Sequence, residues 1–168
     1  MDTPPGRNPT MLFARQKLGL PTRQGTRLAG MLRKNAKVEL IKRVPLFSEC
    51  SRRDLNEIAG IADEIDLAEG KELTKEGGPG REFFVLIEGE ADVKKRSRRV
   101  NRLGAGDFFG EIALVTDRPR TATVVATSPV RALVITDRSF RRLLQHQPQI
   151  QNKVMSALAA RLGPDENL

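Results

Sequence analysis

Hydrophobic and polar residues alternate through the middle of the chain, between residues 65 and 136, and glycines interrupt the alternation at short intervals. A period of two is typical of half-buried strands. It predicts seven strands, over residues 65–68, 72–75, 82–88, 91–95, 100–103, 122–126 and 130–135. No helix-sized segment separates consecutive strands, which disfavours a doubly wound parallel sheet and favours an antiparallel, jelly-roll-like β-roll.

Helical spacing replaces this alternation on the N-terminal side. We expect a helix over residues 26–43, which ends ahead of Pro45 because a proline restricts the residue before it. A second helix, over residues 52–62, should follow the sequence S-R-R-D, in which the Ser51 hydroxyl can accept from a backbone N–H three residues further on.

Two more helices are expected at the C-terminal side. Asp137 is a candidate cap for the first, and the second is bounded by Pro148 in its first turn and by a Gly-Pro stop at residues 163–164. Apolar residues recur along the second helix in one stripe, made by Ile150, Val154, Leu158 and Leu162 with Met155 beside them. This stripe suits packing over the mouth of the roll or against a partner helix, as in a homodimer. The expected fold is therefore mainly β with flanking helices.

Length and cysteine content favour one domain in a reducing compartment. A chain of 168 residues can bury a core without metals or disulfides, and Cys50 has no second cysteine with which to pair. The start of the chain has no signal-peptide pattern, and the longest apolar runs are far shorter than the ~20 residues that span a bilayer. We therefore expect a cytoplasmic protein.

The formal charge of +8 is unevenly distributed. Residues 1–44 hold ten Lys or Arg and two acidic residues, whereas the remainder is neutral overall. We interpret residues 1–25 as a flexible basic arm, and residues 94–99, KKRSRR, as a solvated hairpin tip that discourages edge pairing. Contact of the arm with nucleic acid, a membrane or an acidic partner is the alternative to a merely solvated tail.

Catalytic chemistry is poorly supplied, so we expect neither an enzyme nor a metal site. His146 is the only histidine, and its polar surroundings indicate a surface or cap residue. No Cys, Asp or Glu cluster offers metal-ligand spacing, and no motif of a serine hydrolase, zinc protease or P-loop occurs. The sequence GAGDFFG at residues 104–110 lacks the glycine spacing and βαβ context of a dinucleotide fingerprint.

The stretch GEIALVTDRPRTATV, residues 110–124, has the features of an anion site. Gly110 can begin a short helical turn whose first N–H groups lack intrahelical partners and attract negative charge. Pro119 fixes the backbone immediately before Arg120, which positions a guanidinium. A phosphodiester with one negative charge suits one arginine and several N–H donors.

Glu111 is out of place beside a phosphate, because a carboxylate repels it. The carboxylate is explained if it accepts from hydroxyl donors, such as a ribose 2′-OH. The expected ligand therefore carries a phosphate and a free sugar hydroxyl close together, as in a nucleoside monophosphate folded back on its own ribose.

These residues resemble the phosphate-binding cassette of the cyclic nucleotide-binding domains, a family that includes bacterial catabolite-activator-type regulators, protein kinase regulatory subunits and cyclic nucleotide-gated channels. The matching sequences are FGEIAL from Phe109 and PRTA from Pro119. The glycines at 70, 78, 89 and 106 match the β-roll turns of that family. The resemblance covers about residues 44–162 and assigns residues 44–168 to such a domain.

The resemblance implies roles for particular residues. Arg120 would pair with the cyclic phosphate, and Glu111 would accept the 2′-OH. The remaining contacts implied are the backbones of Gly110, Ile112 and Ala113 and the hydroxyl of Thr121 at the phosphate, and Val93 and Leu103 beside the base. Val93 and Leu103 could equally be ordinary core residues of the roll. Thr121 can bond a syn guanine in this family but also occurs in cAMP binders, and we favour cAMP over cGMP.

The sequence ends soon after the last helix, so we do not expect the helix-turn-helix with which the bacterial regulators read DNA. The expected function is a cyclic nucleotide receptor that changes conformation on binding and acts on a downstream partner. The alternative is an adaptor or nucleic-acid-contacting protein that works through its basic N-terminal arm, with a non-essential or empty nucleotide pocket.

Overall fold

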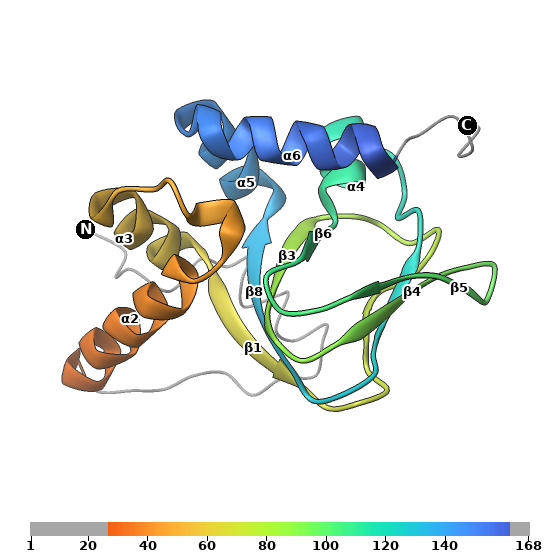
Figure 1. Ribbon diagram of the computed structural model, residues 1–168, viewed down its shortest axis with the longest axis horizontal. Coiled ribbons are helices and arrows are strands. Elements are labelled where there is room, and N and C mark those ends of the chain that lie inside the picture. The colour runs from red at the N-terminus through yellow and green to blue at the C-terminus, as the bar shows by residue number, and fades with distance from the viewer. Residues whose placement is uncertain (1–26, 162–168) are drawn as a thin grey trace.

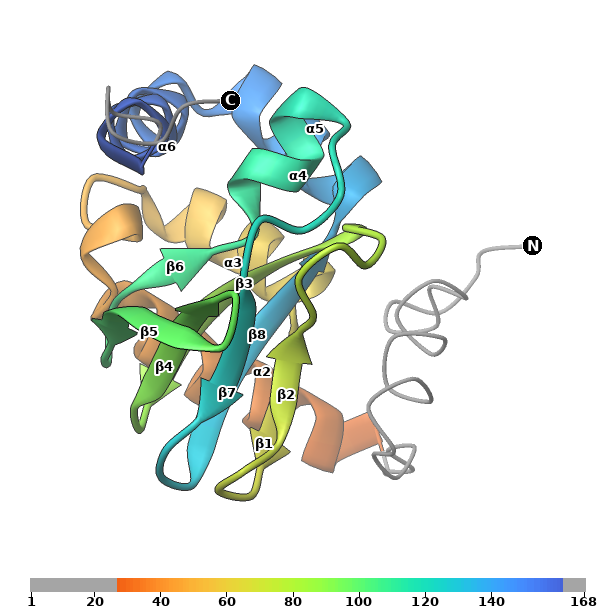
Figure 2. The same cartoon turned by 90° about the vertical axis from the view of Figure 1, so that its right-hand side faces the viewer.

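The computed structural model describes residues 27–161, with side chains placed from Lys34 onward. Its core is a roll of two four-stranded antiparallel sheets, with helices over one end and along one side (Figures 1 and 2). The first sheet has the order β1-β8-β3-β6, and the second has the order β2-β7-β4-β5. The strands are β1 (Asp63–Leu67), β2 (Glu72–Thr74), β3 (Glu82–Glu88), β4 (Ala91–Lys95), β5 (Arg98–Leu103), β6 (Phe108–Phe109), β7 (Thr123–Ala126) and β8 (Val130–Thr136).

This architecture confirms the predicted fold class and all seven predicted strands to within two residues at their ends. Two features were missed. β6 is only two residues long, which is too short for an alternating pattern to register. β5 begins two residues before the prediction, because its first five residues are all exposed and offer no hydrophobic alternation.

The N-terminal helices are α2 (Arg27–Lys42) and α3 (Arg52–Ile61), joined through a short 3-10 turn, η1 (Pro45–Phe47). The capping box is confirmed, since the Ser51 hydroxyl accepts from the Asp54 N–H at 3.1 Å and the Asp54 carboxylate accepts from the Ser51 N–H. The proposed arm, residues 1–25, lies outside the described residues.

The C-terminal helices are α5 (Asp137–His146) and α6 (Pro148–Arg161). The cap predicted for α5 was wrong by one residue, because the Thr136 hydroxyl accepts from the Ser139 N–H and Asp137 is already helical. His146 lies exposed in the last turn of α5, as predicted.

The stripe on α6 packs onto its own fold, where Ile150, Val154 and Leu158 are buried. Met155 was wrongly grouped with this stripe, since it points away and is 47% exposed. Leu162 lies outside the described residues. Within residues 27–161, no helix is long and apolar enough to cross a membrane.

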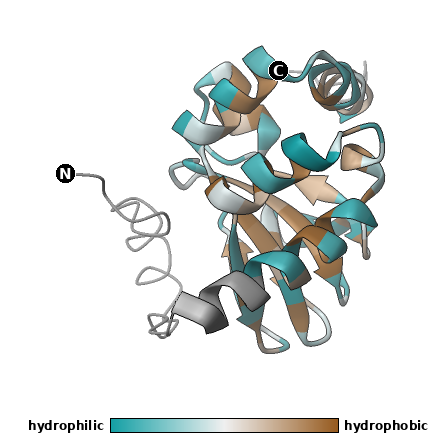
Figure 3. Ribbon diagram, turned by 90° about the vertical axis from the view of Figure 1, so that its left-hand side faces the viewer, coloured by the Kyte–Doolittle hydropathy of each residue, from teal (hydrophilic) through white to brown (hydrophobic). Residues whose placement is uncertain are grey.

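Strand β3 divides the hydrophobic interior into two clusters, because side chains alternate between its faces. Phe83 and Val85 face the helices, while Phe84 and Leu86 face the inside of the roll. A strand buried on both faces explains the continuous apolar run of residues 83–87. Figure 3 shows the hydrophobic residues gathered on the strands and on the inner sides of the helices.

Aromatic stacking joins the helices to this sheet. Phe140 of α5 is fully buried and lies 4.3 Å, centroid to centroid, from Phe83. We expect Phe140→Ala to lower the free energy of unfolding by about 3–5 kcal/mol, because it removes a large buried ring and leaves a cavity. Urea unfolding monitored by circular dichroism measures this loss. Met155→Ala, at an exposed site on α6, serves as control and should change stability by less than about 0.5 kcal/mol.

Candidate functional site

A short helix, α4 (Glu111–Thr116), follows β6 on one side of the roll. Gly110 is its N-cap, with φ of 97°, a left-handed conformation that glycine adopts without steric cost. The short helical turn predicted to begin at Gly110 is therefore confirmed. On its far side, Arg141 of α5 donates to the Leu114 carbonyl at 3.2 Å and to Asp117 at 3.3 Å, which ties α5 to the C-terminal end of α4.

Arg120 enters the site from the loop after α4, and the residue is only 6% exposed. Its main-chain N–H and carbonyl pair with Gly78 and Gly77, so a neighbouring turn fixes its backbone. The guanidinium donates to the Gly110 carbonyl at 3.1 Å and to the Glu82 carbonyl at 2.6 Å, and lies 3.5 Å from the Glu82 carboxylate. These three contacts use three of the five guanidinium N–H groups.

Burial lowers the pKa of Arg120, while the carboxylates of Glu82 and Glu111 act in the opposite direction. The guanidinium nevertheless remains protonated at neutral pH, because the ordinary pKa of arginine lies far above 7. The structure therefore holds a permanent positive charge inside the roll.

Two glycines make room for this side chain. A Cβ on Gly110 would lie 2.7 Å from Arg120 Nη1 and 2.8 Å from the Glu82 carbonyl oxygen. A Cβ on Gly80 would lie 2.4 Å from the Ala113 Cβ and 3.1 Å from Arg120 Nε. Neither space is available to a larger residue without displacing the guanidinium or α4.

Glu111, the first residue of α4, has a fully buried carboxylate. Its Oε1 accepts from Arg161 Nη1 in an ion pair that spans 50 residues of chain. Its Oε2 is buried and has no hydrogen-bond partner among the described residues. A buried oxygen without a hydrogen-bond donor is costly, so a hydroxyl or amine supplied from outside would satisfy Oε2.

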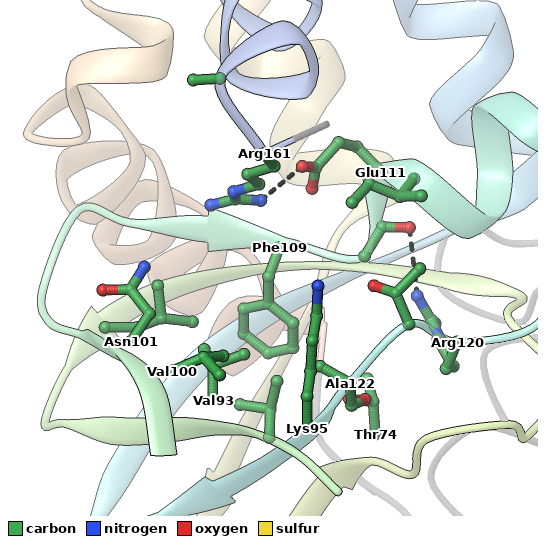
Figure 4. Close-up of a pocket in the computed structure, with 16 residues that line it drawn as sticks. Thr74, Val93, Lys95, Val100, Asn101, Phe109, Glu111, Arg120, Ala122 and Arg161 are labelled. Atoms are coloured by element: carbon green, nitrogen blue, oxygen red, sulfur yellow. Dashed lines mark hydrogen bonds and ion pairs between the residues drawn. The ribbon is translucent and has the colours of Figure 1, made fainter. Parts of the chain in front are cut away.

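Arg161 is the last residue described in α6 and reaches the site from above (Figure 4). Besides the ion pair with Glu111, its Nη2 donates to the Phe108 carbonyl at 2.6 Å, and its guanidinium lies 5.4 Å from the centroid of the Phe108 ring. The end of α6 is thus fastened to both β6 and α4.

A cavity of about 270 Å³ lies between α4, the second sheet and the end of α6. Apolar side chains of β4, β5 and β7 form one wall, Phe109 of β6 another, and polar groups converge from α4 and from the loop that follows it (Figure 4). This volume is near the lower end of the ~300–1,000 Å³ range of small-molecule sites, which suits a ligand of mononucleotide size.

The fold brings seven of the eight sequence-predicted site residues to this cavity: Val93, Leu103, Gly110, Glu111, Ile112, Arg120 and Thr121. Ala113 is the exception, since it is buried behind the lining and its Cβ faces Gly80. Among the described residues there is no group of His, Cys, Asp or Glu side chains that could hold a metal ion.

Several residues at the cavity were not found from the sequence. They are Arg161 and the hairpin residues Lys95, Val100 and Asn101, which line the wall made by β4 and β5. Glu82, which accepts from Arg120 but does not itself line the cavity, was also not found. No local motif marks them. The one available signal was the position of Arg161 in the last turn of a long amphipathic helix whose apolar side packs on the roll.

The sequence of this chain is similar to those of known proteins. The sequence profile described as "Cyclic nucleotide-binding domain" matches residues 64–147. A protein of Rhodopseudomonas palustris named as a potassium channel protein is 32% identical over 133 residues, which are 77% of this chain and 32% of that protein. A cAMP-dependent protein kinase regulatory subunit of Hypocrea atroviridis is 36% identical over 104 residues, 62% of this chain and 22% of the subunit. The chain thus spans a third or less of the length of these relatives.

Solved structures share the fold of this chain. A structure described as cAMP-bound PfPKA-R superimposes with a TM-score of 0.67 and 26% identity, covering 76% of this chain and 48% of the other. The regulatory domain of Toxoplasma gondii PKA with cAMP superimposes with a TM-score of 0.69 and 24% identity, covering 77% and 51%.

The close approach at Gly80 gives a direct test of the packing that holds Arg120. We expect Gly80→Ala to lower the free energy of unfolding by about 1–3 kcal/mol, because the added methyl group overlaps Ala113. Gly60→Ala is the matched control, since an added Cβ there meets nothing within 4 Å and the residue lies in α3. It should instead stabilise the protein, by up to about 1 kcal/mol. Equal effects of the two substitutions on urea unfolding would remove the steric role of Gly80.

Proposed function

Because the chain belongs to the cyclic nucleotide-binding domain family, we propose that its cavity binds a nucleoside 3′,5′-cyclic monophosphate and that the protein is a receptor whose conformation responds to this ligand. The observation that carries the proposal is the buried Arg120 guanidinium beside a buried carboxylate, Glu111, with an unpartnered oxygen. The two groups provide for an anion and for a hydroxyl at the same cavity.

The phosphate belongs at Arg120. Two of its N–H groups are left over after its contacts with Gly110 and Glu82, and the side chain lines the cavity. In this proposal the main-chain N–H groups of Ile112 and Ala113, in the first turn of α4, and the Thr121 hydroxyl complete the phosphate shell. Ala113 contributes only its main chain, because it does not line the cavity. Each charge-assisted bond of this kind contributes about 1.5–3 kcal/mol. The protein holds these donors in place before the ligand arrives, so little ordering remains to be done on binding.

The ribose belongs at Glu111. Its Oε2 is the buried acceptor that lacks a donor, and a ribose 2′-OH supplies one. The ion pair between Oε1 and Arg161 neutralises the carboxylate, which removes most of the repulsion between Glu111 and a nearby phosphate. The sequence-based difficulty of a carboxylate next to an anion is resolved by a partner that comes from the other end of the chain.

The base lies against the apolar wall, where Val93 and Leu103 face the cavity. We propose cAMP as the first ligand to test, because the PfPKA-R and Toxoplasma gondii PKA neighbours are described with cAMP. The hydroxyl of Thr121 also lines the cavity and offers a partner to a guanine base, so cGMP is the ligand to compare.

The response to the ligand follows from the attachment of α6. Its last residue, Arg161, contacts the same carboxylate that would receive the ribose, and its buried face packs against α5 and η1. Binding that favours one position of Glu111 therefore favours one position of α6. We propose that this shift alters the surface seen by a downstream protein, in a regulatory rather than catalytic role.

The phosphate assignment predicts that Arg120→Gln weakens binding of cAMP by about 2–5 kcal/mol, because it removes a charge from a dry site. Isothermal titration calorimetry of the purified protein measures the affinity. Arg131→Gln is the control, since Arg131 pairs with Glu64 and Asp66 at the opposite end of the roll, and it should leave the affinity unchanged. Equal affinities of the Arg120 variant and the parent protein would exclude Arg120 from the phosphate site.

The ribose assignment can be tested by a double-mutant cycle that combines a substitution of Glu111 with a change in the ligand. Glu111→Gln and removal of the 2′-hydroxyl from the ligand should each weaken binding, by about 1.5–3 kcal/mol. Once the 2′-deoxy ligand is used, Glu111→Gln should have little further effect, because both changes remove the same hydrogen bond. Additive losses in titration calorimetry would show that Glu111 does not contact the 2′-OH.

A further inference from the structure

The β4–β5 hairpin carries a concentration of positive charge that the nucleotide site does not explain. Residues 94–102 include six cationic side chains and no acidic one: Lys94, Lys95, Arg96, Arg98, Arg99 and Arg102. The hairpin projects from the side of the roll in Figure 1, and β5 is the edge strand of its sheet. Of the six, only Lys95 lines the cavity. The four arginines are exposed, and Lys94 is half-buried.

The register of this hairpin places like charges opposite one another. Lys94 pairs with Arg99, and the next pair is Lys95 with Arg98. Like charges directly opposite across two strands destabilise a sheet. The pair of Lys94 with Arg99, for which the structure gives no carboxylate partner among residues 34–161, therefore costs stability in the free protein.

The turn that joins the strands adds a second cost. Arg96 and Ser97 both have positive φ, of 50° and 64°. Two-residue turns of this type strongly favour Asn-Gly or Gly-Gly, which adopt such angles easily. In this turn the two positions hold Arg96 and Ser97. The turn therefore carries a charged side chain at a position where glycine would be less strained.

Few acidic side chains of the fold offset the positive charge of this hairpin. Arg102 donates to Asp92 at 3.3 Å, and the Arg96 main-chain N–H donates to Glu76. Among residues 34–161, the structure gives Arg98 and Arg99 no carboxylate within ion-pair distance. Local rules of stability that are broken together at one exposed place point to a function there.

We propose that this hairpin, residues 91–103, is a docking surface for the phosphate backbone of duplex nucleic acid. Four of its six cations are arginines, which recognise phosphate bidentately. A two-stranded ribbon has the dimensions that the major groove admits. The hairpin contains no aromatic residue on which unpaired bases could stack, which favours a duplex over a single strand.

Other partners fit this surface less well. An extended peptide would add to the free edge of β5, but the register shift between Val93 and Lys94 leaves Val100 unpaired as a bulge, and bulges together with edge charges oppose strand addition. A membrane surface calls for apolar anchors, and Val100 is the one large apolar side chain that the hairpin exposes.

The test compares two adjacent arginine pairs in the full-length protein. The variant Arg98→Gln/Arg99→Gln removes two charges from the hairpin, and neither residue lines the cavity. The matched control, Arg52→Gln/Arg53→Gln, removes two exposed charges from α3, where each arginine has a glutamate partner. Binding to a short fluorescent duplex DNA of arbitrary sequence is measured by anisotropy, without nucleotide, at about 50 and about 200 mM salt.

We expect the hairpin variant to bind roughly ten-fold or more weakly than the control at the lower salt, and to reduce the slope of log affinity against log salt by about 2. Its midpoint of urea unfolding should be equal to or above that of the parent, because like-charge repulsion is relieved. Equal DNA affinities of the two variants would overturn the proposal, as would a parent protein that binds phosphatidylserine vesicles and not the duplex. Because no nucleotide is present, failure here is independent of the nucleotide receptor proposed above.

Discussion

A charged guanidinium held beneath a short helix is the constraint on which the rest of this site depends. Arg120 is almost fully buried, and burying a charge is costly unless hydrogen bonds replace its water. The carbonyls of Gly110 and Glu82 and the Glu82 carboxylate do so in part. Two of the five guanidinium N–H groups make no hydrogen bond among the described residues, and the side chain lines the cavity. The left-handed Gly110 and the close contact at Gly80 follow from this requirement, because a larger residue at either position would occupy the same space. The fold thus keeps a buried cation with N–H groups to spare, which is what the proposed phosphate contact requires.

Arginine contacts also connect the cavity to the C-terminal helices. Glu111 begins α4, and its carboxylate is shared between Arg161 of α6 and the cavity. Arg141 of α5 holds the other end of α4. The short helix between them is therefore attached to both C-terminal helices by arginines, and any ligand that orders its first turn acts on all three helices together. This mechanical link is what a receptor in this family needs if occupancy of its cavity is to change its outer surface.

Much of this molecule could be predicted from its sequence because the determining features are local. Alternation of hydrophobic and polar residues predicted the strands, and the sequence around Ser51 predicted the capping box. The glycine, carboxylate and arginine of residues 110–120 predicted a set of side chains that the fold brings to one cavity. What escaped prediction depends on contacts between distant segments. The pairing of Glu111 with Arg161 joins residues 50 positions apart, and the Glu82 carbonyl that anchors Arg120 is a backbone group available at any residue. The first two residues of β5 were not predicted, because a strand that buries only one residue shows no alternation of hydrophobic and polar positions.

The most direct test of the central claim is a nuclear magnetic resonance titration of the arginine Nε–H groups with cAMP. The Arg120 signal is identified as the one absent from the spectrum of Arg120→Gln. A guanidinium already fixed at the cavity should give a resolved Nε–H signal in the free protein, and that signal should move to a new position in proportion to ligand occupancy. A protein that becomes saturated with the nucleotide while the Arg120 signal stays unchanged would contradict the account.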